Sequence, residues 1–135
     1  MIFSQSILIR EQHLDTFGHL NNATYLQLFE QARWDIIDAR GYGVKKIEES
    51  GLGPVVLEIQ IRFSREVLLR ETVEIRSETE AWDGGKTMAM TQTMLNDKGE
   101  ACCVARFLFG LFDTRLRKLV RPTPEWCFAV GADPA

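Results

Sequence analysis

The chain has 135 residues, a formal net charge of −3 and a hydrophobic fraction of 45%. This length favours a single domain over residues 1–135, large enough to form a core without disulfide bonds. The charge balance gives no case for a nucleic-acid-binding protein, and no apolar run approaches the ~20 residues of a membrane span. The three cysteines lack metal-ligand spacing, so we expect reduced core residues in a cytoplasmic protein.

The first half of the sequence predicts a strand, a polar loop and a long helix. Residues 2–10 alternate as in a strand. From Tyr25 to Arg40 the apolar residues recur at helical spacing, and Gly41 to Gly43 form a C-terminal capping signal. Residues 45–53 then form a polar connector with room for one helical turn.

Arg33 lies inside the apolar arc of the predicted helix. An unpaired buried charge is costly, so its guanidinium group is expected to find a carboxylate or a carbonyl oxygen. Glu30, three residues earlier, is one local candidate. Extension of the long side chain to water is the alternative, and the sequence leaves both open.

From Pro54 onward the hydrophobic period changes from about 3.6 residues to 2, which predicts an antiparallel sheet. Tight turns are expected at Asp83–Gly85 and at Asn96–Gly99. The run from Ala101 to Phe112 is apolar on both faces apart from Arg106, so it is expected to be a central strand. The predicted strands are Val55–Phe63, Glu71–Trp82, Lys86–Leu95, Ala101–Phe112 and Arg117–Arg121, followed by a short helix at Pro124–Val130.

This order of elements predicts an α+β fold in which a curved antiparallel β-sheet covers one long central helix. The strand from Val55 to Phe63 is expected to have one solvent-exposed face. Methionine and phenylalanine side chains of the later strands are expected to form ordinary core rather than a ligand pocket. These residues are Met88, Met90, Met94, Phe107, Phe109 and Phe112.

The polar loop before the helix holds an unusual range of chemical groups. It contains the carboxylate of Asp15, the imidazole of His19 and the amides of Asn21 and Asn22, with Gly18 between them. The amides lie where a helix needs an N-cap, and the free N–H groups of a first helical turn suit a developing anion. An acid or base beside such donors is what acyl transfer requires. The alternative is a capped loop in which Asp15 closes an Asx turn and Gly18 only makes a turn.

The segment from Asp15 to Tyr25, with Glu30 and Arg33 on the helix, strongly resembles the hotdog-fold acyl-CoA thioesterases of the 4-hydroxybenzoyl-CoA thioesterase type. The family pattern reads Asp, then Gly-His-Val-Asn-Asn, then Tyr and Glu-x-Ala-Arg, and Leu20 here replaces the usual Val. The resemblance extends over nearly the whole chain. It implies a hotdog fold and hydrolysis of an acyl-CoA thioester to the free acid and CoA.

The resemblance also implies roles for single residues. Asp15 would act as nucleophile or general base, and backbone N–H groups near Asn22 and Ala23 would polarise the thioester carbonyl. His19 follows Asp15 by four residues, as in the similar plant acyl-carrier-protein thioesterases, but Phe17 stands where those proteins have an Asn. The expected catalytic residues are Asp15, His19 and Asn22, and the expected substrate-binding residues are Gly18, Ala23, Tyr25, Arg65 and Lys118, with no metal and no cofactor.

Two other functions stay open on the same fold: a non-catalytic acyl-thioester binding module, and a hydratase or dehydratase. Another hotdog branch uses a helical Glu, but the sequence around Glu30 does not match it. The resemblance further implies a homodimer or homotetramer with shared active sites, while no nucleic-acid or membrane partner is expected. Uncovered strand edges independently favour such association. The candidates for contact with the CoA phosphates are Arg65, Arg70, Arg117 and Lys118.

Overall fold

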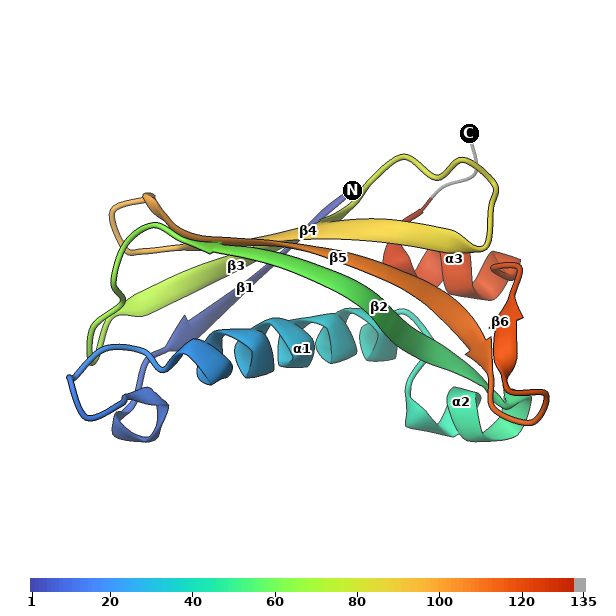
Figure 1. Cartoon of the computed structure of the whole chain (residues 1–135), viewed down its shortest axis with the longest axis horizontal. Helices are drawn as coiled ribbons and strands as arrows, with labels where there is room; N and C mark the ends of the chain where they lie inside the picture. Colours follow the sequence, from blue (N-terminus) through green and yellow to red (C-terminus); the bar gives the residue numbers. More distant parts are fainter. Residues whose placement is uncertain (133–135) are drawn as a thin grey trace.

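The computed structural model describes residues 1–132. One antiparallel sheet arches over a long helix, α1, which lies along the concave face of the sheet (Figure 1). The elements are β1 (Ile2–Leu8), a 3-10 turn η1 (Glu11–His13), α1 (Asn22–Ala39), α2 (Val44–Ser50), β2 (Leu52–Phe63), β3 (Thr72–Thr79), β4 (Thr87–Leu95), β5 (Ala101–Asp113), β6 (Lys118–Val120) and α3 (Pro124–Val130).

The strands are arranged in the order β1-β3-β4-β5-β2, and every neighbouring pair is antiparallel. Strand β6 pairs with the end of β5, beyond the last residue that β4 contacts. Strand β5 therefore has partners on both sides, as its apolar sequence predicted. The expected α+β arrangement of one long helix under a curved antiparallel sheet is confirmed.

Helix α1 holds its place by a stripe of buried side chains at helical spacing. The buried residues of the stripe are Tyr25, Phe29, Ala32, Ile36 and Ile37. The Phe29 ring packs edge-on against Phe107 of β5, with 6.2 Å between ring centroids. Burial of each large apolar side chain contributes about 1.5–3 kcal/mol, so this stripe fixes the helix to the sheet.

Several boundaries differ from the sequence expectation; β3, for example, ends at Thr79 rather than Trp82. Helix α1 begins at Asn22 rather than Tyr25, because the side chain of Asn21 caps it. The polar connector contains a full short helix, α2, which ends where Gly51 takes the left-handed conformation at φ +72°. Strand β2 begins at Leu52, before Pro54. A proline is tolerated there because β2 is an edge strand, with no neighbour on its outer side within residues 1–132.

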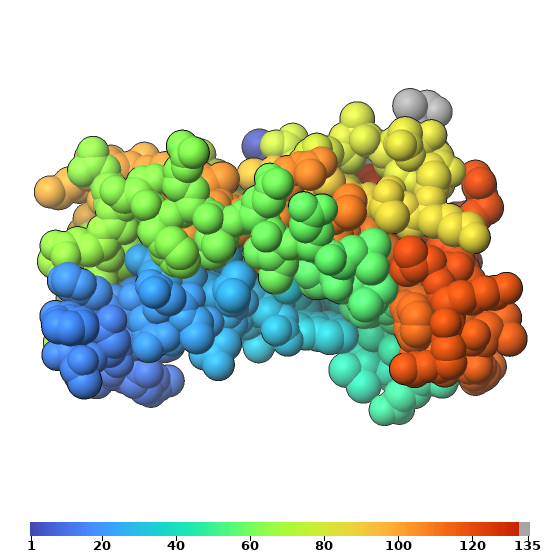
Figure 2. All heavy atoms as spheres, viewed as in Figure 1, coloured from blue at the N-terminus to red at the C-terminus, as the bar shows by residue number. Residues whose placement is uncertain are grey.

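Strand β2 was expected to have one solvent-exposed face, but every residue from Val56 to Gln60 is exposed. The strand lies at the end of the sheet, and a bulge at Leu57 shifts its register against β5. Figure 2 shows its side chains along the front of the molecule, above α1. The exposed fractions of Val56, Leu57, Ile59 and Phe63 are 39%, 45%, 43% and 46%. The edge of the sheet is therefore both unpaired and apolar.

All three cysteines are free and buried, as expected. Burial is the main cause that raises the pKa of the Cys103 thiol, to about 12. Such a thiol stays protonated near neutral pH and is a poor nucleophile. A cytoplasmic location stays a prediction. No helix among residues 1–132 is long and apolar enough to cross a bilayer.

Candidate functional site

The loop before α1 is folded around the side chain of Asp15. Its Oδ1 accepts hydrogen bonds from the backbone N–H groups of Phe17 at 2.9 Å and His19 at 3.3 Å. Gly18 has a φ of +81°, in the region that favours glycine, and this lets the loop turn back. Oδ2 of Asp15 makes no hydrogen bond or ion pair with any residue that the structure describes. One carboxylate oxygen thus holds the loop while the other is left without a protein partner.

One backbone N–H group in the first turn of α1 has no acceptor among the described residues. Oδ1 of Asn21 accepts from the N–H of Ala23 at 2.8 Å, and the backbone oxygen of Asn21 accepts from Thr24 and Tyr25. The N–H group of Asn22 donates to no group within residues 1–132. Since the Ala23 donor is engaged in the cap, Asn22 supplies the remaining N–H at the positive end of the helix.

His19 is tied to the segment that follows β2. Its Nε2 lies 2.8 Å from Oε2 of Glu66, and its backbone forms a β-bridge with Leu68. Both side chains of the pair are about half exposed, at 47% and 57%. Sequence reasoning missed Glu66, which lies far from the loop in the chain. Within residues 1–132 no group of three or more His, Cys, Asp or Glu side chains is placed to hold a metal ion.

Tyr25 was expected to contact substrate, and the structure places it in the core with 3% of its surface exposed. Its ring packs edge-on against Phe63 at 5.0 Å. The pKa of the Tyr25 hydroxyl is raised to about 12, mainly by burial, so the group stays neutral near pH 7. This contact joins the start of α1 to the last residue of β2.

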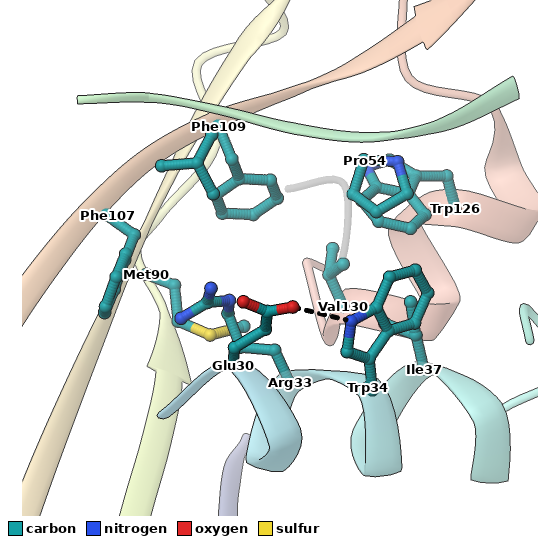
Figure 3. Close-up of a pocket in the computed structure, with 11 residues that line it drawn as sticks. Glu30, Arg33, Trp34, Ile37, Pro54, Met90, Phe107, Phe109, Trp126 and Val130 are labelled. Atoms are coloured by element: carbon teal, nitrogen blue, oxygen red, sulfur yellow. Dashed lines mark hydrogen bonds between the residues drawn. The ribbon is translucent and has the colours of Figure 1, made fainter. Parts of the chain in front are cut away.

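A cavity of about 230 Å³ lies further along α1, between this helix, the sheet and α3 (Figure 3). This is far more than the ~10–15 Å³ that one water needs. Met90, Phe107 and Phe109 are buried in the core, as expected, and they also form part of the cavity wall. The cavity is lined by Glu30, Arg33, Trp34, Ile37, Pro54, Val56, Met90, Phe107, Phe109, Trp126 and Val130.

Arg33 forms part of the cavity wall. Its Nη1 donates to Oε1 of Gln92 at 2.8 Å, and its Cζ lies 4.2 Å from the centroid of the Phe107 ring. Among residues 1–132 no carboxylate forms an ion pair with Arg33. The guanidinium group has therefore found an amide oxygen, which fits the expectation of a carbonyl partner. Burial lowers the pKa of Arg33 to about 10, against an opposing effect of Glu30, and the group remains charged at neutral pH.

Glu30, the local partner considered for Arg33, interacts elsewhere. Its Oε1 accepts from the indole N–H of Trp34 at 3.4 Å. Figure 3 shows its carboxylate next to the Arg33 guanidinium group at the cavity. The sequence contained one signal for this site, which was a charge inside an apolar helical arc.

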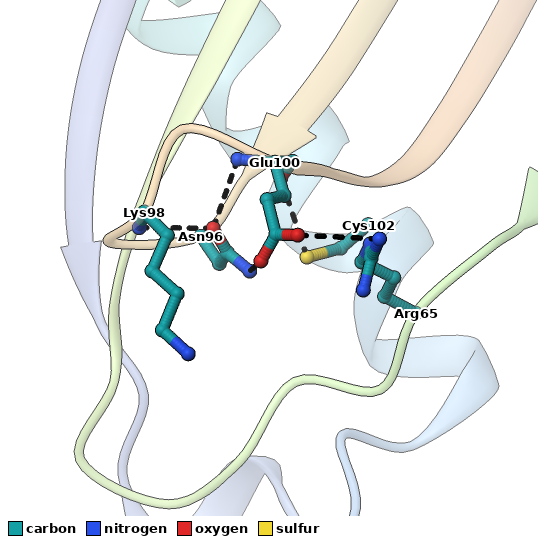
Figure 4. Close-up of polar contacts among 5 residues, drawn as sticks. All are labelled: Arg65, Asn96, Lys98, Glu100 and Cys102. Atoms are coloured by element: carbon teal, nitrogen blue, oxygen red, sulfur yellow. Dashed lines mark hydrogen bonds and ion pairs between the residues drawn. The ribbon is translucent and has the colours of Figure 1, made fainter.

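The structure does not bring the two expected basic substrate-binding residues together. Arg65 follows the end of β2 and pairs with Glu100 at 3.2 Å (Figure 4). Hydrogen bonding from Asn96 and the charge of Arg65 lower the pKa of Glu100. Lys118 lies opposite Asp113, which pairs with the first residue of β2. The 12 residues of β2 separate these positions by roughly 35–40 Å.

The two remaining basic candidates are already engaged. Arg70 pairs with Glu11 at 2.8 Å, beside η1. Arg117 lies over the Phe112 ring, with its Cζ 5.1 Å from the ring centroid. Neither contact excludes an anion, because both side chains are exposed.

The sequence and the fold both have known relatives. The sequence model of the thioesterase-like superfamily matches residues 9–129. The long-chain acyl-CoA thioesterase FadM of Escherichia coli K12 is 28% identical over 112 residues, which is 83% of this chain and 84% of the relative. The crystal structure of YbaW, a probable thioesterase from Escherichia coli, is 26% identical with a TM-score of 0.81, covering 93% of this chain and 94% of that one.

A more distant match has a ligand. The Staphylococcus aureus protein SAV2348, solved in complex with CoA, has a TM-score of 0.89 at 14% identity, covering 97% of this chain and 82% of that one. At this identity the likeness concerns the fold. The hotdog fold expected from the loop and helix is confirmed.

Proposed function

Because the chain belongs to the thioesterase-like superfamily and is a thioester hydrolase, we propose that it hydrolyses acyl-CoA thioesters at the loop before α1. The observation that carries this proposal is the Asp15 carboxylate, anchored through Oδ1 and unpaired at Oδ2, just before the free N–H of Asn22. The E. coli relative is named as an acyl-CoA thioesterase, and the S. aureus structure contains CoA.

The proposed chemistry uses Asp15 in one of two ways. As a nucleophile, Oδ2 attacks the thioester carbon, CoA leaves as the thiolate, and water hydrolyses the mixed anhydride. As a general base, the same oxygen takes a proton from the water that attacks. In both cases the N–H of Asn22 donates to the carbonyl oxygen as negative charge develops there. Heavy-oxygen water tests the nucleophilic role, because label in the Asp15 peptide after turnover appears only if a mixed anhydride has formed and water has opened it at the Asp15 carbon.

We further propose that two chains build each site. The unpaired apolar edge of β2 favours antiparallel pairing with β2 of a second copy. The start of α1 lies at the Phe63 end of β2, whereas the cavity lies at the Pro54 end. A two-fold axis between the two paired β2 strands therefore brings the Asp15 loop of one chain to the cavity of the other. A homotetramer would be a pair of such dimers.

The same two-fold symmetry would bring together basic residues that are far apart within one chain. Arg65 of one chain and Lys118 of its partner come to the same end of the paired strands, although within one chain they lie at opposite ends. A CoA molecule at the rim of this interface would have cations from both chains within reach of its phosphates. The cavity would receive the acyl group, since most of its lining is apolar.

A panel of acyl-CoA thioesters with a thiol-reactive dye tests the proposed activity. Free CoA that accumulates with time supports hydrolysis. Tight binding without CoA release would instead identify a non-catalytic binding module. Hydration or dehydration of a hydroxyacyl or enoyl thioester, with the thioester left intact, would identify the other alternative.

Replacement of His19 by Ala should lower kcat/KM by less than about tenfold. The His19–Glu66 pair is half exposed, and such pairs contribute about 0.2–1 kcal/mol. The side chain orients the loop, and Asp15 performs the reaction. Steady-state kinetics beside thermal unfolding measure this, with Glu66→Gln expected to give a similar change. A loss as deep as that of an Asp15 variant would show that His19 reacts directly.

A further inference from the structure

The cavity contains a cation that an acyl hydrocarbon cannot satisfy. Arg33 carries five N–H donors, and a single hydrogen bond, to Gln92, is formed among the described residues. A hydrocarbon that filled the cavity would remove water from the remaining donors and leave them unpaired. Apart from Glu30, Arg33 and the indole N–H groups of Trp34 and Trp126, the lining is apolar, and the buried Trp126 N–H has no partner among the described residues. A ligand that fits this cavity well therefore needs at least one oxygen on an otherwise apolar group.

Gln92 holds the guanidinium group of Arg33 in place. Gln92, which is fully buried, offers Oε1 to Arg33 while its Nε2 donates to the backbone oxygen of Phe29 at 3.1 Å and to Oγ of Ser77 at 2.9 Å. Both ends of the amide are thus engaged, and it cannot turn away from Arg33. The face of Phe107 supports the guanidinium group at 4.2 Å. Arg33 is therefore prepared to receive an acceptor without rearrangement.

Glu30 decides which oxygen group suits the cavity. Its carboxylate lies beside Arg33, as Figure 3 shows, and it would repel a carboxylate on the ligand. A ketone oxygen accepts from Arg33 but has no hydrogen to donate to Glu30. A hydroxyl group accepts from Arg33 and donates to the exposed carboxylate of Glu30, so it can hydrogen-bond to both side chains. We propose that Arg33 is a specificity-determining residue, which selects acyl groups that carry a hydroxyl at the end far from the thioester. This proposal rests on the proposed thioesterase function.

Pairs of substrates matched in length test the proposal. Unsubstituted acyl-CoAs and the corresponding ω-hydroxyacyl-CoAs are compared by kcat/KM over a series of chain lengths. The wild-type protein should prefer the hydroxylated member roughly 10- to 100-fold at the length that reaches Arg33, and much less at other lengths. Arg33→Met should remove that preference, and Arg33→Lys, which keeps the charge, should retain part of it.

Arg76→Met is the matched control, because Arg76 is an exposed arginine of β3 that pairs with Glu74 outside the cavity. It should keep the full preference. Thermal unfolding of each variant shows whether the protein is folded, and Arg33→Lys carries the test if Arg33→Met does not fold. Equal kcat/KM for both members of every pair, or a preference that survives in Arg33→Met, would overturn the proposal.

A binding measurement separates this proposal from the proposed function. The N-methylamides of the same acyl groups lack CoA and any charge, and Trp34 and Trp126 at the cavity report their binding by fluorescence. Tighter binding of the hydroxylated amides, lost in Arg33→Met, supports the role of Arg33 even if no thioester is hydrolysed. Hydrolysis without any difference between the amides or the thioesters refutes the role of Arg33 and leaves the thioesterase function in place.

Discussion

The substitution Asp15→Asn should lower kcat for acyl-CoA hydrolysis about 10²- to 10⁴-fold without unfolding the protein. The amide oxygen of Asn can still accept from the N–H groups of Phe17 and His19, so the loop keeps its shape. The free carboxylate oxygen becomes an NH₂ group, which is neither a useful nucleophile nor a base. Release of CoA measures the reaction, and thermal unfolding measures the fold.

Asp83→Asn provides the matched control. The Asp83 side chain also closes an Asx turn, accepting from the N–H of Gly85 at 2.8 Å, but it lies in the β3–β4 connection. This variant should retain wild-type activity. Activity of Asp15→Asn within a few-fold of wild type would contradict the role of Asp15. Glu30, the carboxylate at the cavity, would then be the next candidate for the base.

The substitution Leu57→Lys should dissociate the protein into monomers and remove nearly all hydrolysis. Leu57 lies at the bulge of the edge strand, is 45% exposed and does not line the cavity. A lysine there places a charge where the two β2 strands would meet, a common means of blocking edge pairing. In a monomer, the Asp15 loop would lie without the cavity of a second chain, and the proposed site would be incomplete. Light scattering and activity, followed together over a dilution series, measure the effect.

Ile2→Lys is the control for this experiment, since Ile2 is 60% exposed and lies in β1, the strand at the opposite edge of the sheet. It should leave both assembly and activity unchanged. A Leu57→Lys variant that is monomeric and fully active would disprove the shared site, even if Asp15 proved essential. A variant that remains dimeric would show that the chains pair through a different surface.

Local patterns in the sequence predicted most of the fold. Apolar spacing in α1 and alternation in the strands depend on neighbours within a few residues, so one chain is enough to see them. The same holds for the cap, because Asn21 bonds to a residue only two positions away. The helix start was placed too late because Asn22 to Thr24 are polar or small, and they form part of the helix without contributing to its apolar stripe.

The cavity and its charges could not be predicted in this way. Alternation shows which face of a strand a residue occupies, but not whether the opposite element leaves a space against it, so the core residues Phe107 and Phe109 gave no sign that they also line a cavity. The Arg33–Gln92 and His19–Glu66 contacts join residues distant in the chain and leave no spacing to detect. For Arg33 the sequence showed only that a partner was needed.

The buried amide of Gln92 also sets the rotation of α1 about its own axis. It joins the helix, through Phe29 and Arg33, to Ser77 of β3, whereas apolar packing alone tolerates small rotations and shifts. A shift of α1 by one turn, ~5.4 Å, would separate the two hydrogen bonds that join Gln92 to the helix and leave buried polar groups unpaired. One glutamine in the middle of the sheet thereby helps to determine where the first turn of α1, and the Asp15 loop before it, lies relative to the ends of the strands.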